Sequence, residues 1–322
     1  MDKQSKIYVA GHRGLAGSAI VRQLNQKGYR NLVLRTHAEL ELSDQAAVRD
    51  FFQNEKPDYV FIAAAKVGGI VANSSYPAEF VHDNLALQTN VLHESWKAGV
   101  KRLLFLGSSC IYPRDCPQPI KEEYLLTGPL EATNRPYAVA KIAGIEMCWS
   151  YNRQYGTRFL AAMPTNLYGP GDSYDLNNSH VLPALIRKMH EAKKGGLDEA
   201  VIWGTGTPMR EFLYSEDMAE ACVFLLELPE AKFGELISDI LPPLVNIGYG
   251  EDLSIAELAH TVARVIGFGG RLRFDTSKPD GTPRKFLDSG KINALGWKAR
   301  TRFDEGIAAA YKDFLSRYSK SV

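Results

Sequence analysis

Short apolar runs alternate with amphipathic segments through the first half of the chain. The runs predict β-strands at residues 7–10, 32–34, 59–65, 103–107 and 159–164, and helical patterns fall between them at residues 16–27, 44–54, 77–99 and 137–155. Repeated strand–helix units predict a parallel sheet with helices on both faces. The strands are hydrophobic almost throughout, as expected when both faces of a sheet are buried.

The pattern changes after Pro164. Residues 166–180 are rich in Gly, Asn, Asp and Ser, and we expect them to form a long irregular segment, which is usually functional. Further helices are predicted at residues 181–194 and from Ser215, Ser254 and Asp304, with strands at 201–203, 210–213, 244–247 and 271–274. We therefore expect an α/β fold, with a Rossmann-like doubly wound parallel sheet and a smaller α/β C-terminal domain.

The predicted strand at residues 244–247 has the character of a sheet strand, so the chain is expected to cross back into the first domain. That domain is predicted over residues 1–165, with a return of about 214–248. Residues 166–322 are expected to form mainly the second domain.

The composition limits the classes of function. The chain has 322 residues, of which 45% are hydrophobic, enough to bury a substantial core. A formal net charge of +1 gives no reason to expect nucleic acid or an anionic membrane as a partner. The sequence shows neither a signal peptide nor a membrane span, so we expect a soluble, cytoplasmic protein. The four cysteines form no C-x-x-C pair, and no cluster of ligands predicts a metal site.

A glycine-rich turn joins the first predicted strand to the first helix. Gly11, Gly14 and Gly17 form a G-x-x-G-x-x-G pattern, which permits a tight turn and lets the backbone approach a pyrophosphate at the helix N-terminus. Glycines alone would fit a plain turn, but this position between strand and helix favours a dinucleotide site. The first domain is therefore predicted to bind the cofactor.

Basic residues lie where many dinucleotide sites have an acid. The second predicted strand leads into Arg35, Thr36 and His37 in place of the carboxylate that accepts from a ribose 2′-hydroxyl, and Arg13 lies in the glycine turn. Two guanidinium groups can pair with a 2′-phosphate, so the sequence favours NADP(H). The alternative for Arg35 is a solvated surface charge.

A tyrosine and a lysine suggest the reactive centre. Tyr137 and Lys141 are four residues apart, which places them on one face of a helix. A phenol titrates near pH ~10, and we expect the nearby ammonium to lower its pKa so that it can act as acid or base. Such pairs are common by chance, but Ser108 and Ser109 at the end of the fourth predicted strand make the set specific.

With these residues, the chain resembles the extended short-chain dehydrogenase/reductase family over essentially its whole length. The resemblance implies that Ser108 and Tyr137 contact the substrate oxygen and that Lys141 contacts the nicotinamide ribose. Six stretches resemble the GDP-L-fucose synthases of that family, at residues 63–73, 107–113, 164–170, 178–188, 206–214 and 277–285. This implies an NADPH-dependent enzyme that takes GDP-4-keto-6-deoxymannose, inverts C3 and C5, and then reduces C4 to give GDP-L-fucose.

The same resemblance implies two sets of binding residues. Those for NADP(H) are Gly11, His12, Arg13, Gly14, Leu15, Ala16, Gly17, Arg35, His37, Leu42, Ala64, Leu106, Gly107, Ser108, Ser109, Lys141, Pro164, Thr165, Asn166, Leu167 and His180. Those for the GDP-sugar are Lys188, Trp203, Arg210 and Asp280, with the two cations facing the pyrophosphate. Trp203 could equally be a core residue, and Asp280 could simply shape a turn before a glycine. His37 departs from the family, which often has a second arginine there, and imidazole pairs more weakly with phosphate.

Cys110 and His180 match the family's acid/base pair for epimerisation. A C4 ketone acidifies the hydrogens on C3 and C5, and each inversion needs a proton removed from one face and another returned to the opposite face. A thiol near pH ~8.5 and an imidazole near pH ~6.5 suit this task, while Ser108 and Tyr137 would stabilise the enolate. Without the resemblance, Cys110 would be a small buried hydrophobe and His180 a capping or surface residue.

Three other functions stay open. A nucleotide-sugar 4-epimerase or a 4-keto reductase without epimerisation would have no use for Cys110 and His180. An NADP-sensing binding protein of this fold would typically lack Tyr137 or Lys141. The resemblance also implies a homodimer, with which the hydrophobic faces of the helices at 77–99 and 137–155 are compatible.

Overall fold

The computed structural model describes residues 1–176, 179–278 and 280–318. Asn178 and Pro279, which belong to two of the stretches compared above, lie outside the described residues.

Six parallel strands form the largest sheet, in the order β2-β1-β3-β4-β5-β9. They are β1 (Ile7–Ala10), β2 (Leu32–Val33), β3 (Tyr59–Ile62), β4 (Arg102–Leu106), β5 (Phe159–Pro164) and β9 (Leu244–Ile247). Every residue of β1, β5 and β9 is buried, which accounts for their unbroken hydrophobic character. The predicted parallel sheet is confirmed. Its order reverses at β1, and ligands of such sheets bind outside the carboxyl ends of the strands at this point.

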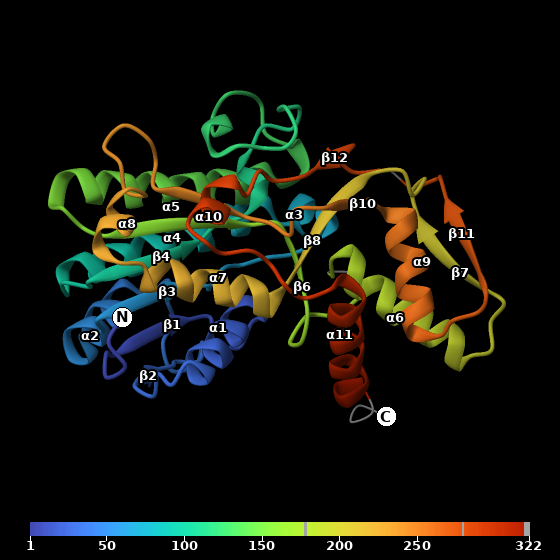
Figure 1. Cartoon of the computed structure of the whole chain (residues 1–322), viewed down its shortest axis with the longest axis horizontal. Helices are drawn as coiled ribbons and strands as arrows, with labels where there is room; N and C mark the ends of the chain where they lie inside the picture. The colour runs from blue at the N-terminus through green and yellow to red at the C-terminus, as the bar shows by residue number, and fades with distance from the viewer. Residues whose placement is uncertain (177–178, 279, 319–322) are drawn as a thin grey trace.

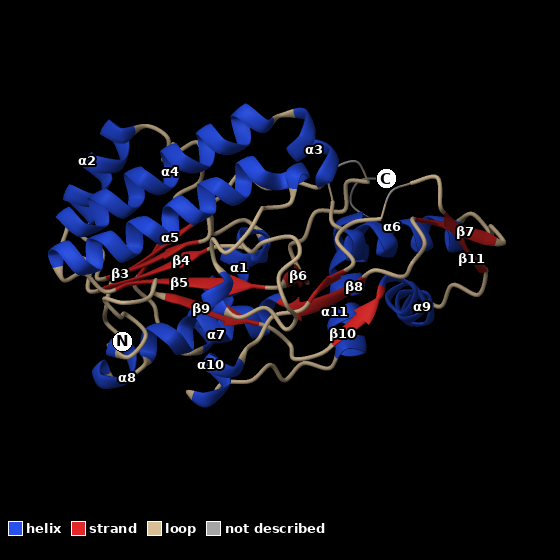
Figure 2. Ribbon diagram, turned by 90° about the horizontal axis from the view of Figure 1, so that it is seen from above, coloured by secondary structure: helices blue, strands red, loops and turns tan. Residues whose placement is uncertain are grey.

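Helices cover both faces of the large sheet (Figure 2). One face carries α1 (Leu15–Gln26), α7 (Ser215–Glu227), α8 (Glu230–Gly234) and α10 (Gly290–Ala294), and the other carries α2 (Gln45–Glu55), α4 (Pro77–Lys97) and α5 (Arg135–Tyr155). A separate hydrophobic cluster fills each interface, including Ile20 and Cys222 on the first face and Phe52 and Ile145 on the second. This is the doubly wound arrangement that the sequence predicts.

Smaller sheets and a third hydrophobic cluster form the other end of the molecule, on the right of Figure 1. β8 (Met209–Tyr214) pairs with β6 (Asn166–Tyr168), β10 (Asp252–Ser254) and β12 (Arg284–Lys285), and β7 (Glu199–Trp203) pairs with β11 (Arg271–Asp275). α6 (Val181–Lys194), α9 (Ile255–Ile266) and α11 (Phe303–Tyr318) pack around the cluster. The smaller α/β part predicted after the large sheet is therefore present.

Several short elements were not predicted. β6 lies inside the segment expected to be irregular, because its hydrogen-bonding partner β8 comes from more than forty residues along the chain. The strand predicted over residues 59–65 ends at Ile62, and beyond it the Lys66 amide donates to Asn84 Oδ1 (3.0 Å). Other unpredicted elements are α3 (Ile70–Ser75), η1 (Ser109–Ile111), η2 (Glu122–Tyr124), η3 (Ala132–Asn134), α8, β10, β12 and α10.

The described helices include none with a long enough apolar stretch to cross a lipid bilayer. Over the same residues, no group of three or more His, Cys, Asp or Glu side chains is placed to hold a metal ion.

Candidate active site

The glycine turn between β1 and α1 is packed too closely for side chains. Gly11 has φ +81°, and a Cβ there would lie 2.6 Å from the Ala64 amide nitrogen at the end of the neighbouring strand β3. A Cβ on Gly17 would lie 2.1 Å from the Gly11 carbonyl oxygen. Gly14 is the N-cap of α1 and supplies no side chain to it, so the first amide groups of the helix remain available to an anion. The turn therefore fits a dinucleotide pyrophosphate.

The basic residues near the turn differ in their availability. The Arg13 side chain makes no hydrogen bond or ion pair in the described parts of the chain and is exposed. Arg35 instead pairs with Glu55 and donates to the Leu34 carbonyl (3.0 Å), so it is not a free surface charge. His37 is 88% exposed at its side chain and pairs with Glu41. A 2′-phosphate could bind the unpaired guanidinium of Arg13 directly, but to bind Arg35 it would have to compete with the Glu55 carboxylate.

The remaining residues predicted for the cofactor follow the carboxyl ends of neighbouring strands. Leu42 comes after β2 and Ala64 after β3, while residues 106–109 begin with the last residue of β4 and residues 164–167 with the last residue of β5. Because the strands are parallel and adjacent, these ends share one edge of the sheet. Thr165 and Asn166 are fixed there by hydrogen bonds from their side chains to the Glu211 carbonyl (3.2 and 2.8 Å).

Tyr137 and Lys141 lie in the first turns of α5, against this edge. The Lys141 ammonium is buried and donates to the Leu106 carbonyl (2.8 Å), at 5.8 Å from the centre of the Tyr137 ring. Burial lowers the pKa of Lys141 to about 8. Burial also raises the pKa of Tyr137, and the nearby Cys110 raises it further. The expectation that the pKa of Tyr137 is lowered is therefore wrong for this structure, because desolvation of the buried phenol raises it.

Cys110 lies in η1, directly after β4, and is 6% exposed. Its amide donates to Ser108 Oγ (3.5 Å), which holds the serine and the cysteine in one short turn. Burial raises the pKa of the Cys110 thiol, while the Lys285 ammonium, the Ser108 hydrogen bond and the Lys141 ammonium oppose the rise. The thiol is thus close enough to Tyr137 and Lys141 for their charges to affect one another.

His180 is the N-cap residue of α6, but its ring makes no capping hydrogen bond. The side chain is exposed, although the protein around it displaces enough water to lower the pKa of the imidazole. No hydrogen bond joins His180 to Cys110 among the described residues. The ring is therefore available to a ligand.

The residues predicted for the GDP-sugar come from α6, β7, β8 and the loop before β12. The Lys188 ammonium lies 4.6 Å from the centre of the Trp203 ring and donates to the Val201 carbonyl (3.3 Å). Trp203 is 55% exposed, which is inconsistent with a core tryptophan. Arg210 is partly buried and donates to the Met209 carbonyl (2.8 Å).

Asp280 is occupied within the protein. Its carboxylate accepts from the Thr205 amide (2.9 Å) and the Thr205 hydroxyl (2.7 Å), so it ties the loop before β12 to the turn after β7. The carboxylate thus holds two segments of the protein together that are far apart in the sequence.

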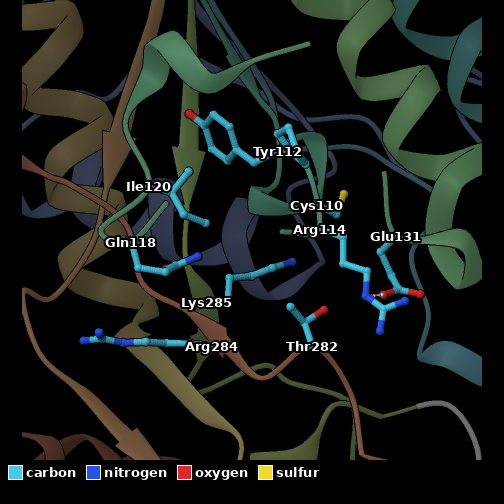
Figure 3. Close-up of a pocket in the computed structure, with 10 residues that line it drawn as sticks. Cys110, Tyr112, Arg114, Gln118, Ile120, Glu131, Thr282, Arg284 and Lys285 are labelled. Carbon is cyan, nitrogen blue, oxygen red and sulfur yellow. Dashed lines mark ion pairs between the residues drawn. The ribbon is translucent and has the colours of Figure 1, made fainter. Parts of the chain in front are cut away.

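A narrow pocket opens beside Cys110 (Figure 3). Its walls come from the segment after η1 and from the loop and strand around β12, and Arg114 and Glu131 form an ion pair across one side (3.5 Å). The lining residues are Cys110, Tyr112, Pro113, Arg114, Gln118, Ile120, Glu131, Thr282, Arg284 and Lys285. Lys285 was not among the candidate residues of the sequence analysis, although it ends one of the six stretches that carried the resemblance.

The described residues thus place a dinucleotide turn, a tyrosine–lysine pair and a thiol along one edge of a parallel sheet. The sequence profile of the NAD dependent epimerase/dehydratase family matches residues 7–248. The chain belongs to that family.

Other members of the epimerase/dehydratase family are similar over nearly the whole chain. GDP-L-fucose synthase 1 of Arabidopsis thaliana is 55% identical over 314 residues, covering 98% of this chain and 94% of that protein. GDP-L-fucose synthase of Escherichia coli K12 is 52% identical over 320 residues, covering 99% of both. Among solved structures, a GDP-mannoheptose C4 reductase from Campylobacter jejuni with NADP bound is 42% identical, with a TM-score of 0.88, covering 98% of this chain and 99% of that one.

Proposed function

We propose that this protein is a GDP-L-fucose synthase, an NADPH-dependent enzyme that epimerises GDP-4-keto-6-deoxymannose at C3 and C5 and reduces C4. The observation that carries the proposal is Cys110, a buried thiol in the turn that also presents Ser108, beside Tyr137. A simple reductase needs the serine and the tyrosine but has no use for the thiol. The identity of 55% to a plant GDP-L-fucose synthase supports the same reading.

The role that we propose for each catalytic group follows from the residues that surround it. NADPH, held at the glycine turn, would supply the hydride for C4. Tyr137 keeps its proton at neutral pH, since a phenol titrates near pH ~10 and burial raises the pKa of this one further, and it can therefore donate to the C4 oxygen. Ser108 would share that oxygen as a donor when the enolate forms. Cys110 and His180 would move the protons at C3 and C5.

The decisive experiment supplies GDP-4-keto-6-deoxymannose and NADPH and identifies the product by NMR. GDP-L-fucose is expected. A product with C4 reduced but C3 and C5 unchanged would instead make the protein a 4-keto reductase, the alternative favoured by its similarity to the Campylobacter jejuni enzyme.

Replacement of Arg13 tests the choice of cofactor. Arg13→Ala should raise the KM for NADPH far more than the KM for NADH, because only NADPH carries the 2′-phosphate that the free guanidinium would bind. Steady-state kinetics with both cofactors measures this. Equal changes in the two KM values would show that Arg13 does not contact the 2′-phosphate.

Replacement of Arg210 tests the nucleotide site. Arg210→Ala removes a charge-assisted contact worth about 1.5–3 kcal/mol, or roughly 10- to 150-fold in affinity. Titration calorimetry with GDP alone should show this loss, since the proposed partner is the pyrophosphate. If GDP binds the variant as tightly as the original protein, Arg210 has a structural role.

We also propose that residues 1–165 with about 214–248 bind the cofactor, that residues 166–322 mainly bind the GDP-sugar, and that the protein is a cytoplasmic homodimer. Support for the dimer comes from α4 and α5, whose outer surface carries the stacked rings of Trp96 and Tyr155 (centres 4.1 Å apart) and an exposed Val139. Light scattering in solution should give twice the chain mass.

A further inference from the structure

Lys285 brings a positive charge to the pocket that holds Cys110. It belongs to β12, where successive side chains point to opposite faces. Arg284 pairs with Asp252 through two hydrogen bonds (2.6 and 3.0 Å), whereas Lys285 is partly buried on the other face. Within the described residues, the Lys285 ammonium makes no hydrogen bond or ion pair. Its charge is therefore not neutralised by a carboxylate.

The thiol and the ammonium are each other's strongest charge partner. Burial raises the pKa of Cys110, and Lys285 is the leading group that opposes this. Burial lowers the pKa of Lys285, and Cys110 is the leading group that opposes that. The geometry agrees, because both residues line the same narrow pocket (Figure 3).

Other charged groups lie near the pair, but each acts on it less strongly. Lys141 also favours the thiolate, though less than Lys285 does, and its ammonium donates to the Leu106 carbonyl. Arg210, Glu131 and Cys116 act on Lys285, and Glu131 is paired with Arg114. Tyr137 also lies beside Cys110, and Tyr112 lines the same pocket; burial raises the pKa of both phenols.

We propose that Lys285 is a positioning residue for Cys110, whose thiolate it stabilises through its charge across their shared pocket. A buried thiol can remove a proton from carbon only as the thiolate, and an opposite charge nearby favours that form. The part played by the thiolate in catalysis rests on the proposed function, whereas the pairing of thiolate and ammonium does not.

The pyrophosphate is the competing partner for Lys285. The strand register sets Lys285 beside Arg210, the cation proposed for the nucleotide. If Lys285 served only the phosphates, its removal would weaken GDP binding and leave the thiol unchanged. The two roles therefore predict different effects on the pKa of the Cys110 thiol, which can be measured without substrate.

The test is the pH dependence of Cys110 alkylation by iodoacetamide, followed by peptide mass spectrometry on the full-length protein without ligand. Lys285→Met should raise the midpoint by about one pH unit or more, since an opposite charge at close range shifts a pKa by roughly 1–3 units. Lys285→Arg should keep the original midpoint. Arg284→Met is the matched control, because Arg284 lines the same pocket but its guanidinium is already paired with Asp252, so this variant should leave the midpoint unchanged.

An unchanged midpoint in a folded Lys285→Met variant overturns the proposal, and a simultaneous loss of GDP affinity would assign Lys285 to the pyrophosphate. If circular dichroism shows that this variant is unfolded, Lys285→Gln, which retains most of the side-chain stem, gives the same comparison. A separate experiment tests the proposed function. If the original protein does not exchange deuterium at C3 and C5 of the sugar, that function is wrong, while the alkylation midpoints still decide the role of Lys285.

Discussion

Cys110→Ala should abolish deuterium exchange at C3 and C5 of GDP-4-keto-6-deoxymannose in heavy water without NADPH. The intact enzyme should exchange both positions, because removing and returning these protons does not require the hydride. General acid–base groups contribute about 10²- to 10⁴-fold, so the rate should fall at least about a hundredfold. No serine can replace the thiol, since the Ser108 hydroxyl titrates far above the working pH. NMR of the recovered sugar nucleotide measures the exchange.

Two comparisons make this result specific. Cys116→Ala is the matched control, because it removes a thiol from the same segment outside the proposed machinery and should exchange at the original rate. His180→Gln should alter exchange at one centre more than at the other, since the two groups would serve opposite faces of the sugar. Normal exchange and normal GDP-L-fucose formation by Cys110→Ala would mean that the thiol only fills space.

Tyr137→Phe should stop reduction at C4 and spare part of the exchange. Its phenol is the proposed acid for the C4 oxygen, and loss of that acid should slow NADPH oxidation by about 10²- to 10⁴-fold. Exchange should persist at a reduced rate, because Ser108 still holds the oxygen of the enolate. Absorbance of NADPH and NMR of the sugar follow the two reactions separately.

Tyr155→Phe is the control for this change, since it makes the same substitution on the same helix at an exposed position. Both activities should stay normal there. If Tyr137→Phe lost exchange as completely as reduction, the tyrosine would serve both reactions, and the division of labour proposed here would not hold.

Much of the fold was predictable because its signals are local. The predicted strands at residues 7–10, 159–164 and 244–247 and the helix at 181–194 have the same ends in the structure. These strands are buried on both faces, so an unbroken apolar run marks them. α6 buries one face only, and its apolar residues recur with the helical period.

Part of the candidate site was also predictable from short-range sequence patterns. Gly11 and Gly17 must be glycines because neighbouring backbone occupies the place of a side chain, and their spacing is visible in the sequence. Tyr137 and Lys141 share a helix face at a fixed spacing. Cys110 and His180 became candidates only through the resemblance to known enzymes. Composition and periodicity alone indicated a small buried hydrophobe and a capping or surface residue.

What the sequence determined by itself was therefore the order of elements, the parallel sheet and the residue types at its carboxyl edge. Only the tertiary structure decided which groups meet there. β6 and β12 exist because β8 lies beside them, and β12 places Lys285 in the pocket that Cys110 also lines. Arg35 is paired because α2 brings Glu55 to it. The pKa of Tyr137 rises rather than falls because desolvation depends on every segment packed around the phenol, and no spacing within one helix can specify that.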